Sequence, residues 1–255
     1  MHLILADGCN LTVNGGINVS EGNSLTIYAQ STGKDMGALT ATGTDSQAGI
    51  GSGYYSTSGI ITINGGTVKA TGGGGGAGIG GGAFGAVGTI TISGGAVTAT
   101  GGINSGAGIG GGGTIIISGG TVNATGGYGG GAGIGGSSTI IISGGTVTAN
   151  GNFGGAGIGG GSGTFSTGKD GRAVIIASRI DDKDDTTEWS GVVFQGKTGA
   201  VYGANIAPAE DFTIPADSTL TIENGKTLTI SEGVTLTNHD ARNLLSDLPA
   251  RLPRG

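Results

Sequence analysis

The stretch TIIISGGTVNATGGYGGGAGIG, residues 114–135, holds the pattern that decides the fold. The same phrase occurs in four copies, which begin at residues 60, 89, 114 and 139 and are therefore 29, 25 and 25 residues apart. A period of this length is typical of a solenoid, in which each repeat buries its apolar face against the next repeat. We therefore expect the chain to wind into stacked coils.

Each copy begins with two stretches that alternate in polarity. Ile115 and Ile117 point to one face of an extended chain, because strand side chains alternate, and Val122 with Ala124 repeats this pattern. Between them lie the glycines at 119–120, which tolerate positive φ and favour a tight corner. These features predict two short strands that are separated by a corner.

A second glycine corner, at 126–127, precedes the segment GAGIGG, in which we expect a third strand. There Ala132 and Ile134 are two residues apart, so we expect both to point inward, and we expect a bulky residue at position 132 to overpack a narrow core by about 1–3 kcal/mol. The expected inward columns are Ile90, Ile115 and Ile140; Val68, Val97, Val122 and Val147; Ala77, Ala107, Ala132 and Ala156; and Ile79, Ile109, Ile134 and Ile158.

The resulting fold class is all-β: a single-stranded parallel β-helix, or β-solenoid, expected to be right-handed, with about three short strands per coil of 25 residues. We expect glycine-rich coils over residues 1–171. Residues 172–240 are expected to continue or cap these coils and to carry an acidic loop, and residues 241–255 are expected to be disordered.

Composition excludes several classes of protein. Glycine accounts for 63 of 255 residues, yet 35% of the chain is hydrophobic and only 11% is charged, which argues against disorder. Collagen is excluded, because glycine does not recur at every third position. No basic stripe is present and the net charge is −6, so we expect no nucleic-acid partner. No apolar stretch is long enough to cross a bilayer.

Three parts of the sequence carry a family resemblance: the phrase GGTVxATGG…GAGIGGG, the stretch GRAVIIASRI…EWSGVVFQG over residues 171–196, and TLTIENGKTLTISEGVTLTN at 219–238. Together they resemble glycine-rich β-solenoid repeat regions of cell-surface proteins from gut anaerobic bacteria. The resemblance implies a secreted or cell-surface, extracellular location within a larger surface protein, and it carries no catalytic residues. A more remote likeness, to pectate-lyase-like β-helices that bind or cleave polysaccharides, rests on architecture alone.

Aromatic residues offer a candidate ligand site. Gly74, Ile103, Tyr128 and Phe153 occupy matching positions after the second strand, so Tyr128 and Phe153 are expected to stack on successive coils. Such a ladder suits a polysaccharide or host glycan; the alternative is that the rings only cover exposed glycine backbone. Trp189 could offer a further binding face or pack inside the fold.

Acidic residues gather at 180–189, where Asp181, Asp182, Asp184 and Asp185 are candidate calcium ligands. Their spacing matches no known calcium loop, so a solvated acidic loop is the alternative, and no other cofactor is expected.

Threonines at outward positions form the third candidate site. Thr91, Thr98, Thr121, Thr146 and Thr148 are expected to face solvent in rows, as an ice-binding surface would require, although threonine is also a common strand residue.

The coils from 60 to 163 lack the paired carboxylates that polysaccharide hydrolysis requires, so we expect no enzyme and place polysaccharide lyase activity last. The expected function is a non-catalytic structural or adhesive segment of a secreted bacterial surface protein. The alternative is a carbohydrate-binding module, and ice binding follows it.

Overall fold

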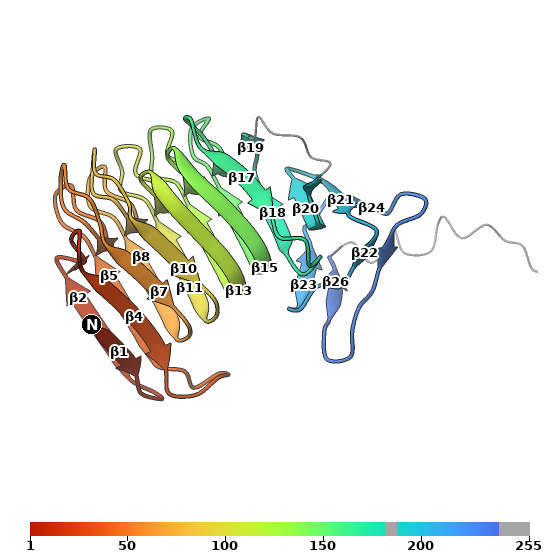
Figure 1. Ribbon diagram of the computed structural model, residues 1–255, viewed down its shortest axis with the longest axis horizontal. Helices are drawn as coiled ribbons and strands as arrows, with labels where there is room; N and C mark the ends of the chain where they lie inside the picture. Colours follow the sequence, from red (N-terminus) through yellow and green to blue (C-terminus); the bar gives the residue numbers. More distant parts are fainter. Residues whose placement is uncertain (182–187, 240–255) are drawn as a thin grey trace, which may run out of the picture.

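The computed structural model describes residues 1–181 and 188–239 of the 255-residue chain. Within these residues the secondary structure consists of strands and turns, with no α-helix. The strands stack into an elongated parallel β-solenoid whose axis runs along the molecule, with the N-terminus at one end (Figure 1). The predicted all-β solenoid is confirmed. The predicted tail at 241–255 lies outside the described residues.

Each coil contributes three strand segments. The first segments lie in β1 (His2–Leu5), β4 (Ser24–Ala29), β7 (Ile60–Ile63), β10 (Thr89–Ile92), β13 (Gly113–Thr125), β15 (Ser138–Asn150) and β17 (Thr164–Thr167). The second segments lie in β2 (Asn10–Asn14), β5 (Ala38–Thr42), β8 (Thr67–Thr71), β11 (Ala96–Thr100), the latter halves of β13 and β15, β18 (Val174–Ala177) and β20 (Gly191–Gln195). The third segments are β3 (Ile17–Asn18), β6 (Ile50–Gly51), β9 (Ile79–Gly80), β12 (Ile109–Gly110), β14 (Ile134–Gly135), β16 (Ile158–Gly159) and β19 (Ile180–Asp181), which form a 7-stranded parallel sheet.

The stacking register places identical residues over one another. Ile90 pairs with Ile115 and Ile115 with Ile140, and the valine column pairs in the same way. These side chains are fully buried, and complete burial of such a side chain contributes about 1.5–3 kcal/mol. The core is therefore a set of stacked aliphatic columns that run along the solenoid axis.

The first glycine corner separates two strands in the first two copies, β7 from β8 and β10 from β11, as predicted, but differs from the prediction in the last two. In β13 and β15 the first two segments form one continuous strand, and the corner is a register shift between Ile117 and Thr121. Gly120 has φ +81°, whereas Gly119 does not have positive φ. One left-handed residue therefore bends the chain, and pairing in the original register resumes at Thr121.

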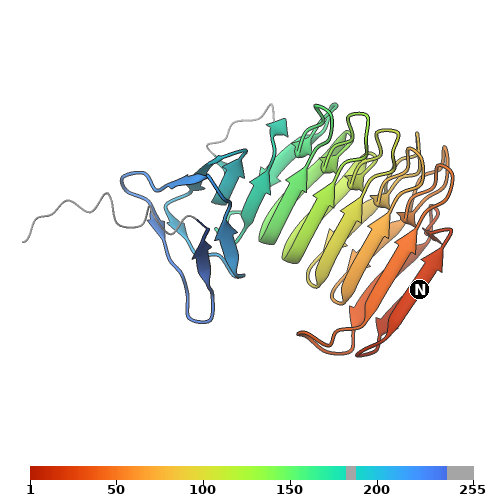
Figure 2. The same cartoon turned by 180° about the vertical axis from the view of Figure 1, so that it is seen from behind.

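The last part of the described chain reverses direction. Strand β20 still stacks in parallel on β18, but β21 (Thr198–Tyr202) pairs with β20 antiparallel across the two-residue turn at 196–197. Strands β22 (Asn205–Ile206) and β23 (Phe212–Ile214) follow, and a further turn of chain adds β24 (Thr219–Thr221), β25 (Thr227–Leu228) and β26 (Leu236–Asn238) in parallel. Figure 2 shows this part set apart from the stacked coils.

A second apolar cluster joins this reversed part to the last coils: Val201, Ile206 and Phe212 pack with Val174, Val192 and Phe194 of β18 and β20. The coils continue past residue 171 as far as Gln195, and residues 198–239 form a small second stack rather than further turns of the first one.

Candidate functional site

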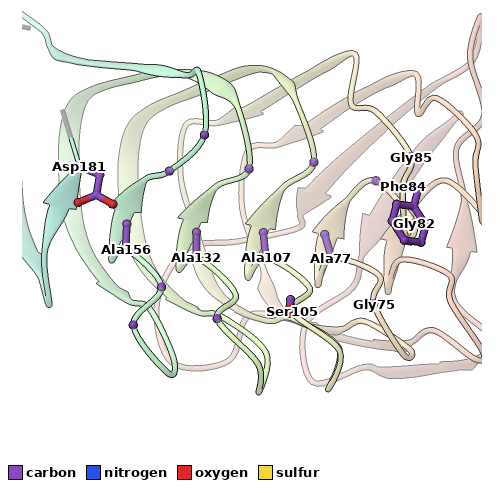
Figure 3. A pocket seen from close by; sticks show the side chains of 18 of the residues that line it. Gly75, Ala77, Gly82, Phe84, Gly85, Ser105, Ala107, Ala132, Ala156 and Asp181 are labelled. Carbon is purple, nitrogen blue, oxygen red and sulfur yellow. The ribbon is translucent and has the colours of Figure 1, made fainter. Parts of the chain in front are cut away.

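A groove runs along the solenoid beside the third strand segments. Its cavity volume is about 360 Å³, and its lining residues come from successive coils between Gly75 and Asp181. Glycines from the loops on either side of the third segments form the walls, and alanines stand in a row along it (Figure 3). The loops that close each coil therefore build one continuous channel across several coils.

The alanine column of the repeat lies between the core and this groove, which corrects the prediction in part: Ala77 and Ala156 are buried as predicted, whereas Ala107 and Ala132 are only half-buried. Ala77, Ala107, Ala132 and Ala156 line the groove, and the isoleucines two residues later are fully buried in the core. The reason is local: the glycine between each alanine and isoleucine lies in a bend, so strand alternation does not extend across it. A larger residue at position 132 would enter the groove.

Phe84 stands at one end of the groove and belongs to an exposed aromatic cluster (Figure 3). Its ring is stacked on Tyr55, with centroids 5.2 Å apart and an interplanar angle of 19°, and Tyr54 meets both rings edge-on. A side-chain hydrogen bond with Tyr55 raises the pKa of the Tyr54 phenol. The side chain of Phe84 is 78% exposed. Sequence reasoning missed this cluster, although Tyr55 and Phe84 are one repeat, 29 residues, apart.

The predicted ladder of Tyr128 and Phe153 forms on the neighbouring loops. The two ring centroids are 4.0 Å apart, and both side chains are more than 60% exposed. Gly130 and Gly154, which follow these residues in the same loops, line the groove. The ladder therefore stands on the loops that form one wall.

Several of these aromatic residues have strained backbones. Tyr55, Phe84 and Phe153 have φ values of +53°, +57° and +46°, in the left-handed region that glycine occupies at most other corners of this chain. A bulky residue there costs conformational energy that glycine avoids, and these rings are not buried in the core. The strain motivates the hypothesis that the rings have a role at the surface.

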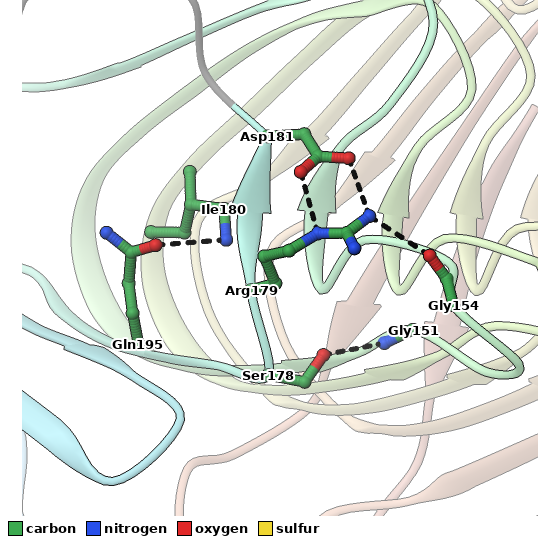
Figure 4. Close-up of polar contacts among 7 residues, drawn as sticks. All are labelled: Gly151, Gly154, Ser178, Arg179, Ile180, Asp181 and Gln195. Atoms are coloured by element: carbon green, nitrogen blue, oxygen red, sulfur yellow. Dashed lines mark hydrogen bonds and ion pairs between the residues drawn. The ribbon is translucent and has the colours of Figure 1, made fainter.

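The opposite end of the groove is closed by an ion pair between Arg179 and Asp181. Arg179 Nε lies 2.7 Å from Asp181 Oδ1, and Nη2 donates to Asp181 Oδ2 at 2.8 Å and to the Gly154 carbonyl oxygen at 3.0 Å (Figure 4). Ser178 fixes the same corner through its hydroxyl, which accepts a hydrogen bond from the Gly151 N–H. Both charges of the groove lining are therefore paired with each other.

This pairing bears on the predicted calcium site. Of the four candidate ligands, Asp181 is bound to Arg179, and Asp182, Asp184 and Asp185 lie outside the described residues. Glu188, at the end of the acidic segment, approaches Lys169 at 3.8 Å. Residues 1–181 and 188–239 contain no group of three or more His, Cys, Asp or Glu side chains that could hold a metal ion.

Trp189 is 4% exposed and packs between Phe165 and Tyr202, with ring centroids 5.2 Å from each. Its edge lines a second cavity, of about 710 Å³, that also involves Lys226 and Glu223. Lys226 donates to the Val201 carbonyl oxygen, lies over the Tyr202 ring and lowers the pKa of Glu223 by hydrogen bonding and by its charge. Of the two roles considered for Trp189, a binding face or packing inside the fold, these contacts correspond to packing.

The expected threonine rows are interrupted by the second stack. Thr98 and Thr121 are exposed, whereas Thr146 donates from Oγ1 to the Asp211 carbonyl oxygen at 3.0 Å. Thr148 shares a cleft with Phe212 and other residues of β23 and β26. The row therefore does not offer the open, flat surface that ice binding would require along its whole length.

The groove has the chemistry of a neutral polar channel. The alanines contribute methyl groups, and the N–H groups of Gly136 and Gly160 donate to no acceptor among the described residues. A ligand with both C–H faces and hydroxyl groups would find a partner for each.

Comparison with known proteins supports the architecture. A family model described as Beta helix repeat matches residues 61–83, 90–113, 115–138 and 140–162. The searches of curated proteins and of solved structures gave no match. None of the described residues belongs to a helix that could span a membrane. The four matched segments follow one another along the parallel β-solenoid.

Proposed function

We propose that this chain is a non-catalytic structural or adhesive rod within a secreted bacterial surface protein. The observation that supports this role is the uninterrupted parallel pairing from β3 to β19, in which seven successive third segments stack on one another. Backbone groups paired in this way on both sides are held in place and are poor substrates for proteases. A rod of this kind suits an extracellular spacer.

The groove supports the non-catalytic part of the proposal. Among the described residues of its lining the one carboxylate is Asp181, which is held by Arg179. Glycoside hydrolysis requires two carboxyl groups that flank the scissile bond.

Resistance to proteolysis tests the structural role. With proteinase K, we expect the coils over residues 60–163 to survive as an intact fragment under conditions that degrade the urea-unfolded chain within minutes. Mass spectrometry of the surviving fragment gives the measurement. Cleavage within these coils as fast as in the unfolded control would contradict the rod. Antibody labelling of intact, unpermeabilised source cells tests the surface location separately.

Carbohydrate binding is the second candidate, and the exposed aromatic ladders beside the groove favour it. Aromatic faces bind the apolar faces of sugars, and large exposed apolar patches mark interaction sites. The alternative, that the rings only shield glycine backbone, predicts a loss of stability rather than of binding when they are removed.

The combined substitution Tyr128→Ala and Phe153→Gly separates these alternatives. We expect at least a fivefold loss of affinity for the polysaccharide that the wild type binds on a glycan array, with little change in the melting temperature. Glycine suits the left-handed backbone at position 153, so removal of the ring adds no strain there. Unchanged binding together with a lower melting temperature would assign the rings to shielding.

A further inference from the structure

We infer that the alanine-floored groove binds an uncharged, linear polysaccharide that lies along the solenoid axis. This inference rests on the carbohydrate-binding candidate above and assigns its ligand class and its site. Two observations support it: the exposed ring of Phe84 at one end of the groove, and the neutral lining between that ring and the Arg179–Asp181 pair.

The charges of the groove select against an acidic polymer. The cationic group in the lining is Arg179, whose guanidinium already binds both carboxylate oxygens of Asp181 and the carbonyl oxygen of Gly154. A uronate bound there would have to displace Asp181 and would leave that carboxylate without its cation. A neutral chain can bind without breaking this ion pair, since its hydroxyl groups can form hydrogen bonds with backbone groups of the walls.

The geometry selects a chain that runs across the coils. Ala77, Ala107, Ala132 and Ala156 follow one another on successive coils, and coils stack about 4.8 Å apart. A linear polysaccharide advances by a similar distance per sugar, so one sugar can occupy one coil. An extended peptide advances by about 3.3–3.6 Å per residue and would lose this register after two coils.

The ends and sides of the groove supply complementary contacts. Phe84 presents a ring whose position is supported by Tyr55 stacked on it. On the walls, the N–H groups of Gly136 and Gly160 have no acceptor among the described residues and can bind sugar hydroxyls. The methyl groups of Ala107 and Ala132, which are half-buried, are small enough to leave space for the chain and apolar enough to contact its C–H groups.

The test fills the groove without adding charge. In the double variant Ala107→Leu and Ala132→Leu, leucine side chains enter the channel on two adjacent coils. The matched control is Thr98→Leu and Thr121→Leu, which places the same leucine side chains on the same two coils at exposed strand positions outside the groove. Binding is measured by affinity electrophoresis and calorimetry with soluble glucan, mannan and xylan as neutral probes and polygalacturonate as the acidic probe.

We expect the wild type and the threonine control to bind at least one neutral polymer, the alanine double variant to lose at least tenfold in affinity, and polygalacturonate to bind to none of them. The variant Phe84→Gly removes the ring from a residue with a left-handed backbone and is expected to lower the affinity about fivefold. It still tests the groove if the alanine double variant fails to fold. A neutral polymer that binds equally to the wild type, the alanine variant and Phe84→Gly would overturn the groove assignment but leave carbohydrate binding intact elsewhere on the rod. Preference for polygalacturonate would overturn the ligand class. Binding to none of the four polymers would overturn this inference, and an empty glycan array would remove the carbohydrate-binding candidate as well.

Discussion

Replacing Ile134 with Ala is expected to destabilise the solenoid by about 2–5 kcal/mol, one of the two largest effects in this chain. Ile134 is fully buried and is stacked between Ile109 and Ile158 in the sheet of third segments. Truncation removes three carbon atoms from a closely packed column and leaves a cavity that the short, two-residue strands cannot close without losing their register. The decrease is measured as the change in unfolding free energy in urea, followed by far-ultraviolet circular dichroism.

The matched control lies two residues away. Ala132→Leu adds the bulk that Ile134→Ala removes, yet Ala132 faces the groove, so its effect is expected to stay within about 1 kcal/mol, as for surface positions. If Ala132→Leu were as destabilising as Ile134→Ala, the alanine column would belong to the core. The groove assignment would then be wrong.

The core columns could be predicted from the sequence because they depend only on the period and on alternation within strands. Ile115 and Val122 recur at equivalent positions of every copy, and parallel stacking must place them over one another. The alanine column followed the same reasoning only in part, since Ala77 and Ala156 are buried but Ala107 and Ala132 are half-buried beside the groove. Ala132 and Ile134 are two residues apart, but the bend at Gly133 breaks the alternation that the prediction assumed.

Features that depend on contacts between nonequivalent residues were harder to predict. The exposed Tyr54, Tyr55 and Phe84 cluster arises where two loops from adjacent coils meet, and the longer 29-residue period hides their equivalence. Likewise, the pairing of Arg179 with Asp181 depends on a loop conformation that residue spacing alone does not specify.

The reversal after β20 did have a sequence signal. Gly196 and Lys197 separate two alternating stretches by two residues, a spacing that favours an antiparallel hairpin, and Gly196 has φ +59°. The prediction that residues 172–240 continue or cap the coils did not locate this reversal, because the flanking strands resemble those of the repeats.

The second large effect is expected for Gly127→Ala, which should destabilise the fold by about 3 kcal/mol through overpacking between coils. The φ of Gly127 lies outside the left-handed region, so the backbone itself tolerates an L residue. The obstacle is the preceding coil: a Cβ at Gly127 would overlap the carbonyl oxygen of Gly102 and would lie 3.1 Å from that of Gly101. Relief would require the two coils to move apart and would strain the hydrogen bond from Gly127 N–H to the Gly106 carbonyl oxygen.

Gly53→Ala provides the control, because Gly53 also lies outside the left-handed region and a Cβ there meets no atom within 4 Å. This change is expected to be neutral or to stabilise the protein by about 0.4–1 kcal/mol, since alanine restricts the unfolded chain. Urea unfolding compares the two variants, and hydrogen exchange should show faster exchange in β11 and β13 for Gly127→Ala alone. Equal stability of the two variants would mean that the coils have room between them at this corner. The abundant glycine would then have no structural cause at this corner. If the expected difference is found, close stacking of the coils is the reason why this solenoid needs a glycine at position 127.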